Sequence, residues 1–385
     1  MRYLYVDYAA TTPVNKKVIK AILPYFSKNF GNPSSSHAYG TKVKEILTKS
    51  RMKVADFLNC SPEEVIFTSG GTESENLAIK GIAFSNKKFG KHIIISSVEH
   101  VSVDSSASFL EKQGFQVSRI PVNHDCMVDV AILESAIRED TILISVMYVN
   151  NEIGTIQPIQ QISEMLKRVN LEREKLNKNR ILLHTDGEAG SVYMDYDVNK
   201  LGVDSLSVNG SKIYGLKGAS ALYVKNGVGV STQICGGGQE SMIRGGTENV
   251  PAIVALAEAL SIAKITRIEN VKKVLAIKNK LITSLSIKIK GVRINTPLDS
   301  VPNIVHVTFL DNTIVDIIVE LNTLGLCVSN GAACASNKDK KSQVLEAMGF
   351  NESEMNMSVR FSFGVPSKKS DVSRIIKILS KVLSK

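Results

Sequence analysis

The sequence has no run of apolar residues that approaches the roughly 18 needed for a membrane-spanning helix. Its first residues, MRYLYVDYAATTP, also lack the apolar core and small-residue cleavage site of a secretion signal and instead predict a short strand followed by a turn. These absences argue against a membrane role, and we expect a cytoplasmic protein. No internal repeat or low-complexity segment interrupts the 385 residues, a length that favours one large and one smaller domain.

Cysteines are few, and none has the paired spacing that holds zinc or builds a disulfide framework. The five cysteines are Cys60, Cys126, Cys235, Cys327 and Cys334. No metal site is expected from them, but an odd, scattered set makes at least one a candidate reactive thiol.

Basic residues outnumber acidic ones, 47 to 37, for a net charge of +10. They are spread along the chain and are not interleaved with aromatic residues in one patch. The basic run at residues 167–180 alternates in charge, as an exposed helix end or loop does. We therefore interpret the excess as solvated surface and expect no direct nucleic-acid binding.

Short β-branched runs alternate with amphipathic stretches between residues 65 and 224. This pattern predicts strand–helix–strand units and a mostly parallel sheet, with a ligand site at the carboxyl ends of its strands. The expected strands are Val65–Thr68, His92–Ser96, Gln116–Ile120, Thr141–Met147, Ile181–Thr185, Val203–Val208 and Ala221–Val224.

A long helical stretch, with or without a break, is predicted from Pro251 to about Leu285. The fold class is therefore α/β: a large domain over residues 1–255 and a smaller α+β domain over 256–385, with residues 1–15 a candidate to pack with the smaller one. The elements expected in the smaller domain are strands at Val292–Asn295, Asn303–Phe309 and Ser358–Phe363 and helices at Thr313–Leu321 and Ser370–Leu383.

Gly70, Gly71 and Thr72 follow the first strand and open a helix. Backbone N–H groups and the helix dipole would face one point there, which suits a phosphate. Any tight strand-to-helix turn could use the same residues, so this segment indicates a phosphate site only together with other residues.

Three further residues carry chemistry of their own. Asp186 ends the strand ILLHTD, where its carboxylate either pairs with a protonated ring nitrogen or caps a helix. Lys212, in SVNGSKIYGLKG, could reach inward and form a Schiff base. Cys334, in VSNGAACASN, could be a buried inert thiol, but its small and polar neighbours favour an exposed thiol that does chemistry.

These elements occur in the order of the fold-type I enzymes that use pyridoxal 5'-phosphate (PLP), and the chain resembles their NifS/IscS-like cysteine desulfurases, in the class V aminotransferase group. The resemblance spans essentially the whole chain. The matching segments are DYAATTP, FGNPSSSH, FTSGGTESENLAIKG, VEHVSV, VNNEIGTIQP, KIYGLKG, GGGQE, RGGTENVPAIV, SNGAACAS and VRFSFG.

The resemblance implies a role for each matching residue. Lys212 would bind PLP and shuttle the Cα proton of the substrate, Asp186 would keep the ring nitrogen protonated, and His100 would stack on the ring and assist proton transfer. Arg360 and Asn32 would hold the substrate carboxylate, for which a guanidinium is well matched. The other implied PLP ligands are Gly71, Thr72, Asn209 and Ser211 at the phosphate, Thr247 of the partner subunit, and Asn151 at the phenolic oxygen. Without the family context, His100 would be interpreted as structural and Arg360 as a surface charge.

The implied activity is conversion of L-cysteine to L-alanine with the sulfur transferred as a persulfide on Cys334. A thiol with a pKa of about 8.5 is mostly protonated at neutral pH, so the site would have to help ionise Cys334. The implied partners are a sulfur-acceptor protein, for iron–sulfur cluster assembly or tRNA thiolation, and a second copy of the chain in a homodimer. Two alternatives remain: a PLP-dependent C–S lyase that releases sulfide, and a degenerate homologue that binds PLP but has low activity.

Three positions depart from the family pattern. Ala189 stands where the family has a glutamine that donates to the phenolic oxygen, Ser211 replaces a histidine before the lysine, and Cys235 replaces a histidine before the GGG segment. Losing one hydrogen bond to a charged partner, roughly 1.5–3 kcal/mol, could slow turnover about 10- to 100-fold if nothing compensates. Glu188 is a new polar group beside the site, although a carboxylate replaces an amide donor only when protonated. Cys235 is either a second sulfur-handling thiol or, as we favour, a small residue at a packed position.

Overall fold

The computed structural model describes residues 3–310, 316–331 and 341–384. Cys334 and the start of the helix expected at Thr313–Leu321 lie outside these residues.

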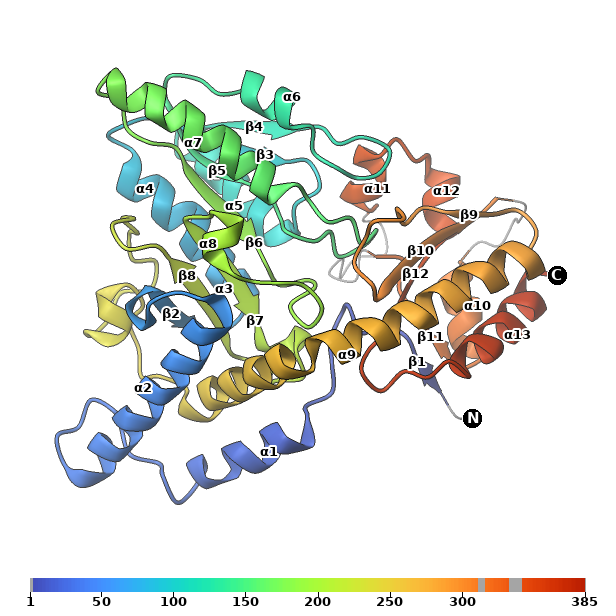
Figure 1. Cartoon of the computed structure of the whole chain (residues 1–385), viewed down its shortest axis with the longest axis horizontal. Coiled ribbons are helices and arrows are strands. Elements are labelled where there is room, and N and C mark those ends of the chain that lie inside the picture. The colour runs from blue at the N-terminus through green and yellow to red at the C-terminus, as the bar shows by residue number, and fades with distance from the viewer. Residues whose placement is uncertain (1–2, 311–315, 332–340, 385) are drawn as a thin grey trace.

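A seven-stranded sheet forms the centre of the larger part of the molecule (Figure 1). β8 is antiparallel to both of its neighbours, and every other neighbouring pair is parallel. The expected mostly parallel sheet is confirmed, and expected strand ends differ from the observed ones by two residues at most. The strands, in spatial order, are β2 (Val65–Thr68), β8 (Ser220–Val224), β7 (Ser205–Asn209), β6 (Leu182–Asp186), β5 (Thr141–Ser145), β3 (His92–Ser96) and β4 (Gln116–Ile120).

Helices cover both faces of this sheet, which explains why its central strands are apolar at consecutive positions. On β3, Ile94 belongs to the core cluster that includes helix α7 (Ile159–Lys175), whereas Ile93 and Ile95 pack with α4 (Ile82–Asn86) and α5 (Val101–Lys112). Successive side chains of a strand point to opposite faces, so a strand buried on both faces needs no polar alternation. Figure 1 shows α7 in front of the sheet and α4 and α5 behind it.

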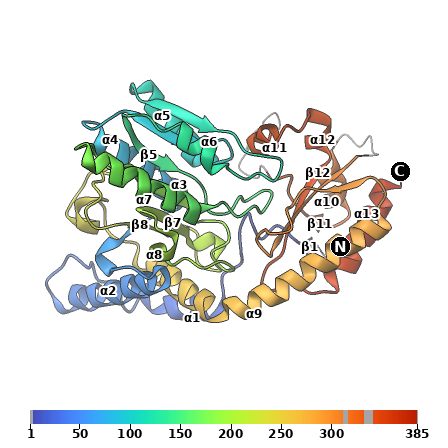
Figure 2. The ribbon, with the colours of Figure 1, turned by 45° about the horizontal axis from the view of Figure 1, so that its top comes forward.

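Helix α9 (Val250–Lys288) is one helix of 39 residues that connects the two parts of the molecule. Asn249 caps its first turn, and Pro251 lies where a helix tolerates proline. Its first half packs against α1 (Lys16–Ile22) and α2 (Ala38–Leu58), and its second half reaches the smaller sheet (Figure 2). The remaining helices of the larger part are α3 (Gly71–Asn76), continued by a π-helical turn at Leu77–Gly81, α6 (Val130–Ser135) and α8 (Val198–Leu201).

The smaller part is built on an antiparallel sheet in the order β12 (Ser358–Ser362), β10 (Ile304–Phe309), β9 (Val292–Ile294). The amino terminus joins this part, because β1 (Leu4–Tyr5) pairs with β11 (Leu326–Cys327). The division at residue 255 stays a prediction, and that residue lies inside α9. The helices of this part are α10 (Ile317–Thr323), α11 (Gln343–Ala347), α12 (Glu352–Asn356) and α13 (Asp371–Leu383).

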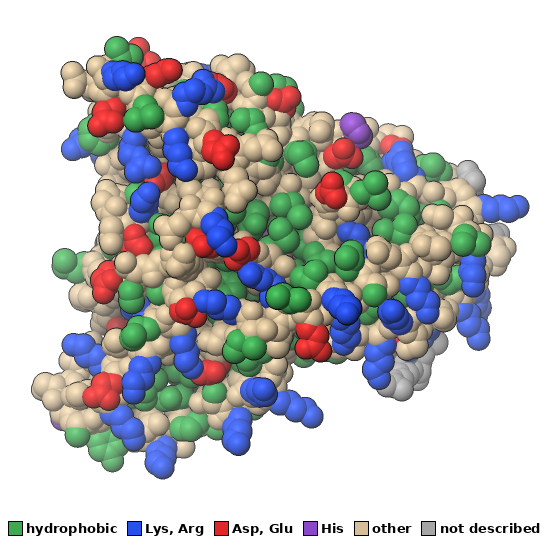
Figure 3. Space-filling model, viewed as in Figure 1, with side chains coloured by type: hydrophobic (Ala, Val, Ile, Leu, Met, Phe, Trp, Pro, Cys, Tyr) green, Lys and Arg blue, Asp and Glu red, His purple; other side chains and the backbone are tan. Residues whose placement is uncertain are grey.

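Charged side chains are distributed over the molecular surface. On the face seen in Figure 3, basic side chains lie over both parts of the molecule and are interspersed with acidic ones. Within the part of the chain that is described, no helix combines the length and the apolar character that crossing a membrane would need.

Candidate active site

A cavity of about 370 Å³ lies where the carboxyl ends of the large sheet face the smaller part of the molecule. Parallel strands end on one edge of a sheet, so the residues that follow them gather in one place. Five of the predicted site residues line this cavity: His100, Asn151, Asp186, Lys212 and Arg360.

Lys212 is directed by the short turn that follows β7. The segment Gly210–Lys212 forms a single 3-10 turn, and the Asn209 side chain accepts a hydrogen bond from the backbone N–H of Ser211 at 3.0 Å. The Lys212 Nζ donates to the backbone oxygens of Ala9, at 3.0 Å, and Ala10, at 2.7 Å. The amino-terminal loop therefore holds the amine in the cavity.

Asp186 is the last residue of β6 and is buried. Its Oδ1 accepts a hydrogen bond from the backbone N–H of Glu188 at 2.8 Å. The carboxylate therefore caps a turn at the cavity wall and does not cap a helix.

His100 caps a helix and also lines the cavity. It is the N-cap of α5, where its Nδ1 accepts from the backbone N–H of Ser102 at 3.2 Å. A neutral imidazole that accepts at Nδ1 carries its proton on Nε2. The residue thus combines a capping role with a place in the cavity wall.

Arg360, on β12, brings a positive charge from the smaller part of the molecule. Its Nη1 donates to the backbone oxygen of Asn151 at 2.7 Å, and its Nη2 donates to Asp7 Oδ1 at 2.7 Å. Its Nε has no hydrogen-bond partner among the residues described. The guanidinium is therefore fixed in orientation, and its buried Nε–H is one of the donors that these bonds leave unused.

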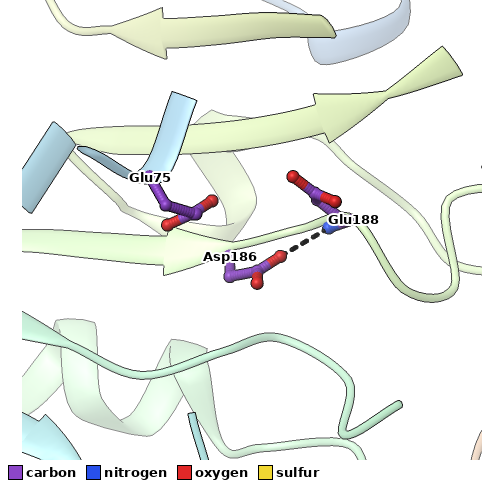
Figure 4. A group of neighbouring side chains, drawn as sticks. All are labelled: Glu75, Asp186 and Glu188. Carbon is purple, nitrogen blue, oxygen red and sulfur yellow. Dashed lines mark hydrogen bonds between the residues drawn. The ribbon is translucent and has the colours of Figure 1, made fainter. Parts of the chain in front are cut away.

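Three carboxyl groups meet beside the cavity, as Figure 4 shows: Glu75 from α3, Asp186 from the end of β6 and Glu188 from the loop that follows. One oxygen of each lies within 4.8 Å of the others. Burial, and then the charges of Asp186 and Glu75, raise the pKa of Glu188 to about 8. Sequence reasoning missed this cluster, since its members lie up to 113 positions apart, between Glu75 and Glu188.

Glu75 is held in a fully buried network beside Asp186. Its Oε2 lies 2.8 Å from His184 Nε2, and Ser207 Oγ donates to its Oε1. Burial, together with Asp186, raises the pKa of Glu75, and burial lowers the pKa of His184 to about 4. Burial therefore favours the neutral form of both groups in this pair.

The predicted phosphate cradle lies against the same cluster. Gly71 is buried, and a Cβ there would collide with the Glu188 carboxylate in its present position, so the glycine allows this close approach. Asn209 Nδ2 donates to Glu188 Oε2 at 2.9 Å, and Ser211 Oγ donates to Asn209 Oδ1 at 3.0 Å. The second helical residue, Thr72, is exposed.

Besides Gly71, Thr72, Asn209 and Ser211 of the predicted cradle, two further predicted site residues, Asn32 and Thr247, are not among the described residues that line the cavity. Both are exposed, and Asn32 Oδ1 accepts from the backbone N–H of Ser34 at 2.9 Å. Their roles stay predictions. Cys334 lies outside the described residues, but Gly331 and Lys341, on either side of that segment, both line the cavity.

The favoured interpretation of Cys235 was wrong. The residue is exposed and does not occupy a packed position, because it lies in the irregular segment between β8 and the short helix at Gln239–Met242. It is not among the described residues that line the cavity.

The side chains present fit PLP. In the cavity wall, Lys212 offers an amine and Asp186 a carboxylate for the ring nitrogen. Beside the wall, Asn209 is bonded to the cavity-lining Glu188, and Ser211 is bonded to Asn209, so both offer polar groups for a phosphate. The buried Oε1 of Glu188 has no hydrogen-bond partner within the described ranges, which marks a polar site open to a ligand.

Comparisons with known proteins agree with this geometry. Residues 4–375 match the family model of the class-V aminotransferases. The chain is 42% identical over 383 residues to the cysteine desulfurase IscS of Methanosarcina thermophila, covering 99% of this chain and 92% of that protein. It is 40% identical over 382 residues to cysteine desulfurase IscS 1 of Archaeoglobus fulgidus, covering 99% and 97%.

Solved structures give the same result. A NifS-like protein superposes with a TM-score of 0.91 at 33% identity, covering 99% of each chain. SspA in complex with cysteine superposes with a TM-score of 0.80 at 33% identity, covering 93% of this chain and 98% of that one. The chain belongs to the class-V aminotransferase family, with the fold-type I architecture. Within that family its place is among the cysteine desulfurases, which confirms the resemblance seen in the sequence.

Proposed function

We propose that this enzyme is a PLP-dependent cysteine desulfurase that converts L-cysteine to L-alanine and carries the sulfur as a persulfide on Cys334. The observation that carries the proposal is the placement of Lys212, Asp186 and Arg360 around one cavity of about 370 Å³. An amine, an anion and a guanidinium there match the aldehyde and ring nitrogen of PLP and the carboxylate of an amino acid.

PLP, when bound, withdraws electrons from the Cα of the amino acid. Lys212 would hold the cofactor through its Nζ and then take and return the Cα proton. Asp186 would keep a proton on the ring nitrogen, and the Nε2 of His100 would assist proton transfer. The amino-terminal carbonyls of Ala9 and Ala10 orient the Lys212 amine for this work.

Arg360 would bind the substrate carboxylate. Asp7 and the Asn151 carbonyl already hold two of its nitrogens. Substrate binding therefore has to order the Arg360 side chain little further. A cysteine held by Arg360 would lie in the same cavity as Lys212, which would act on its Cα.

In the sulfur step, the Cys334 thiolate would attack Sγ of the bound cysteine. An S–S bond forms and the C–S bond breaks, and the electron pair of that bond stays with carbon, which takes a proton to give alanine. The balance is one cysteine and one thiol giving one alanine and one persulfide. The position of Gly331 and Lys341 in the cavity wall supports this assignment, since they flank the Cys334 segment.

The persulfide sulfur would pass to an acceptor protein in iron–sulfur cluster assembly or tRNA thiolation, and the names of the IscS relatives support the first. A homodimer and a cytoplasmic location belong to the same proposal. The exposure of Thr247 supports the dimer, because the residue is available to reach a partner subunit's cradle.

The test is incubation with L-cysteine and a reductant, with alanine and sulfide measured together. We expect the wild type to form alanine and sulfide in equal amounts, and Cys235→Ser, a control at an exposed thiol, to do the same. Cys334→Ser should form almost none of either product. Undiminished sulfide from Cys334→Ser would instead identify a C–S lyase. A colourless protein whose spectrum is unchanged by added PLP would identify a degenerate homologue.

A further inference from the structure

The Glu188 carboxyl group lies on the predicted phosphate cradle. It contacts Gly71 closely enough to exclude a Cβ there, and its Oε2 accepts from Asn209 Nδ2 at 2.9 Å. Its Oε1 is buried and has no hydrogen-bond partner within the described part of the chain. Figure 4 shows this carboxyl group beside those of Glu75 and Asp186.

A carboxylate and a phosphate would compete at this position. Asn209, expected to bind the phosphate, is already bonded to Glu188. An ionised Glu188 is only an acceptor and repels a phosphate that carries a charge of about −1.5 to −2. A protonated Glu188 is an O–H donor and can bind a phosphate oxygen, which would compensate for Ser211 in place of histidine.

We propose that Glu188 sets the affinity of the site for the cofactor phosphate, binding it as a protonated donor and excluding it as a carboxylate. The inference rests on the proposed function, in that the cavity must bind PLP, and it adds that PLP binding depends on one proton at Glu188.

The surroundings of Glu188 favour the protonated form at neutral pH. Burial is the main cause of its raised pKa of about 8, followed by Asp186 and Glu75, while Asn209 and His100 act in the opposite direction. The change from donor to excluding anion therefore falls near pH 8. The titratable groups that act on Glu188 or share its cavity wall are Glu75, Glu99, His100, Glu152, Asp186, Tyr196, Lys212, Lys341 and Arg360.

The test is equilibrium binding of PLP to the cofactor-free protein, followed by absorbance at pH 7, 8 and 9. Between pH 7 and 9, the affinity of the wild type for PLP is expected to fall about tenfold more than that of Glu188→Gln. The reason is that a group with a pKa near 8 loses about nine-tenths of its protons over that range. Glu188→Ala should show the same flat profile as Glu188→Gln. Glu63→Gln, at an exposed glutamate, should follow the wild type.

Pyridoxal, which lacks the phosphate, identifies the group involved. Its affinity should change equally with pH in wild type and Glu188→Gln. Parallel PLP profiles in these two proteins, or an equal difference with pyridoxal, would overturn the inference and leave the proposed function intact. If PLP binds none of the proteins at any pH, the proposed function fails, and the inference fails with it.

Discussion

Arg360 Nη2 donates a 2.7 Å hydrogen bond to Asp7 Oδ1, although the two residues are 353 positions apart in the sequence. The Arg360 side chain is 1% exposed and that of Asp7 is 17% exposed. A buried charge without a partner costs several kcal/mol. Asp7 therefore allows a guanidinium to remain in the cavity wall, where it can meet a substrate carboxylate.

Asp7→Ala is expected to lower the free energy of unfolding by about 3–5 kcal/mol, because it leaves the Arg360 charge buried and unpaired. Asp7→Asn keeps an acceptor and should cost less. Both should raise KM for L-cysteine as Arg360 loses its orientation. Urea unfolding and steady-state kinetics measure the two effects. Asp299→Ala, at an exposed aspartate, is the control. If Asp7→Ala unfolds at the same urea concentration as this control, the Asp7–Arg360 pair does not stabilise the fold.

Lys212→Ala should abolish covalent retention of PLP and lower alanine formation by at least about 10³-fold, since the variant lacks both the attachment point and the proton carrier. The absorbance of the protein after gel filtration measures retention. Lys217→Ala, an exposed lysine in the same loop, should behave as the wild type. Retained colour in Lys212→Ala would assign the attachment elsewhere.

Ala189→Gln should raise turnover about tenfold or more. Ala189 lines the cavity, and the new amide would supply a hydrogen bond to a charged partner, worth roughly 1.5–3 kcal/mol. Ala189→Leu adds similar bulk without a donor and should not raise the rate. An unchanged rate in Ala189→Gln would show that the missing glutamine does not limit this enzyme.

Glu99 predicts a pH dependence of folding stability. Burial raises its pKa to about 8, although Ser96 Oγ and the Met147 N–H both donate to it. The folded state thus keeps a proton on Glu99 that the unfolded chain releases above about pH 4.3. The contribution of Glu99 to stability is therefore greatest below that pH and is lost progressively until about pH 8. The loss is about 1.4 kcal/mol per unit of pKa difference.

Glu99→Gln should flatten this dependence, because a side chain that does not titrate binds no proton in either state. Urea unfolding of the cofactor-free protein at pH 5 and pH 8 measures it. If the free energy of unfolding changes equally between pH 5 and pH 8 in wild type and Glu99→Gln, Glu99 is not the group responsible.

The elements that the sequence predicted well are those with local signals. β3 and β4 have the expected bounds because β-branched runs with clear breaks define them, and Lys212 follows β7 as its spacing predicted. α9 is unbroken, and it has buried apolar residues from Val250 to Leu285, with contacts to α1, α2 and the smaller sheet.

The features that could not be predicted from the sequence depend on contacts between residues far apart in the chain. The pairing of Asp7 with Arg360 and the network of Glu75 with His184 join elements far apart in the chain. The one available signal for Asp7 was an acidic residue among apolar and small residues in LYVDYAA, whereas Glu75 lies among polar residues in TESEN and gave no such signal. Glu188 was recognised as a new polar group, but its contact with Gly71 follows only from how β6 and α3 meet.

The most direct measurement is the mass of the Cys334 peptide after the holoenzyme has reacted with a limited amount of L-cysteine. The account predicts one additional sulfur atom on Cys334 for each alanine released, removed by a thiol reductant and absent in Cys334→Ser. Continued release of alanine without any added sulfur on Cys334 would contradict it.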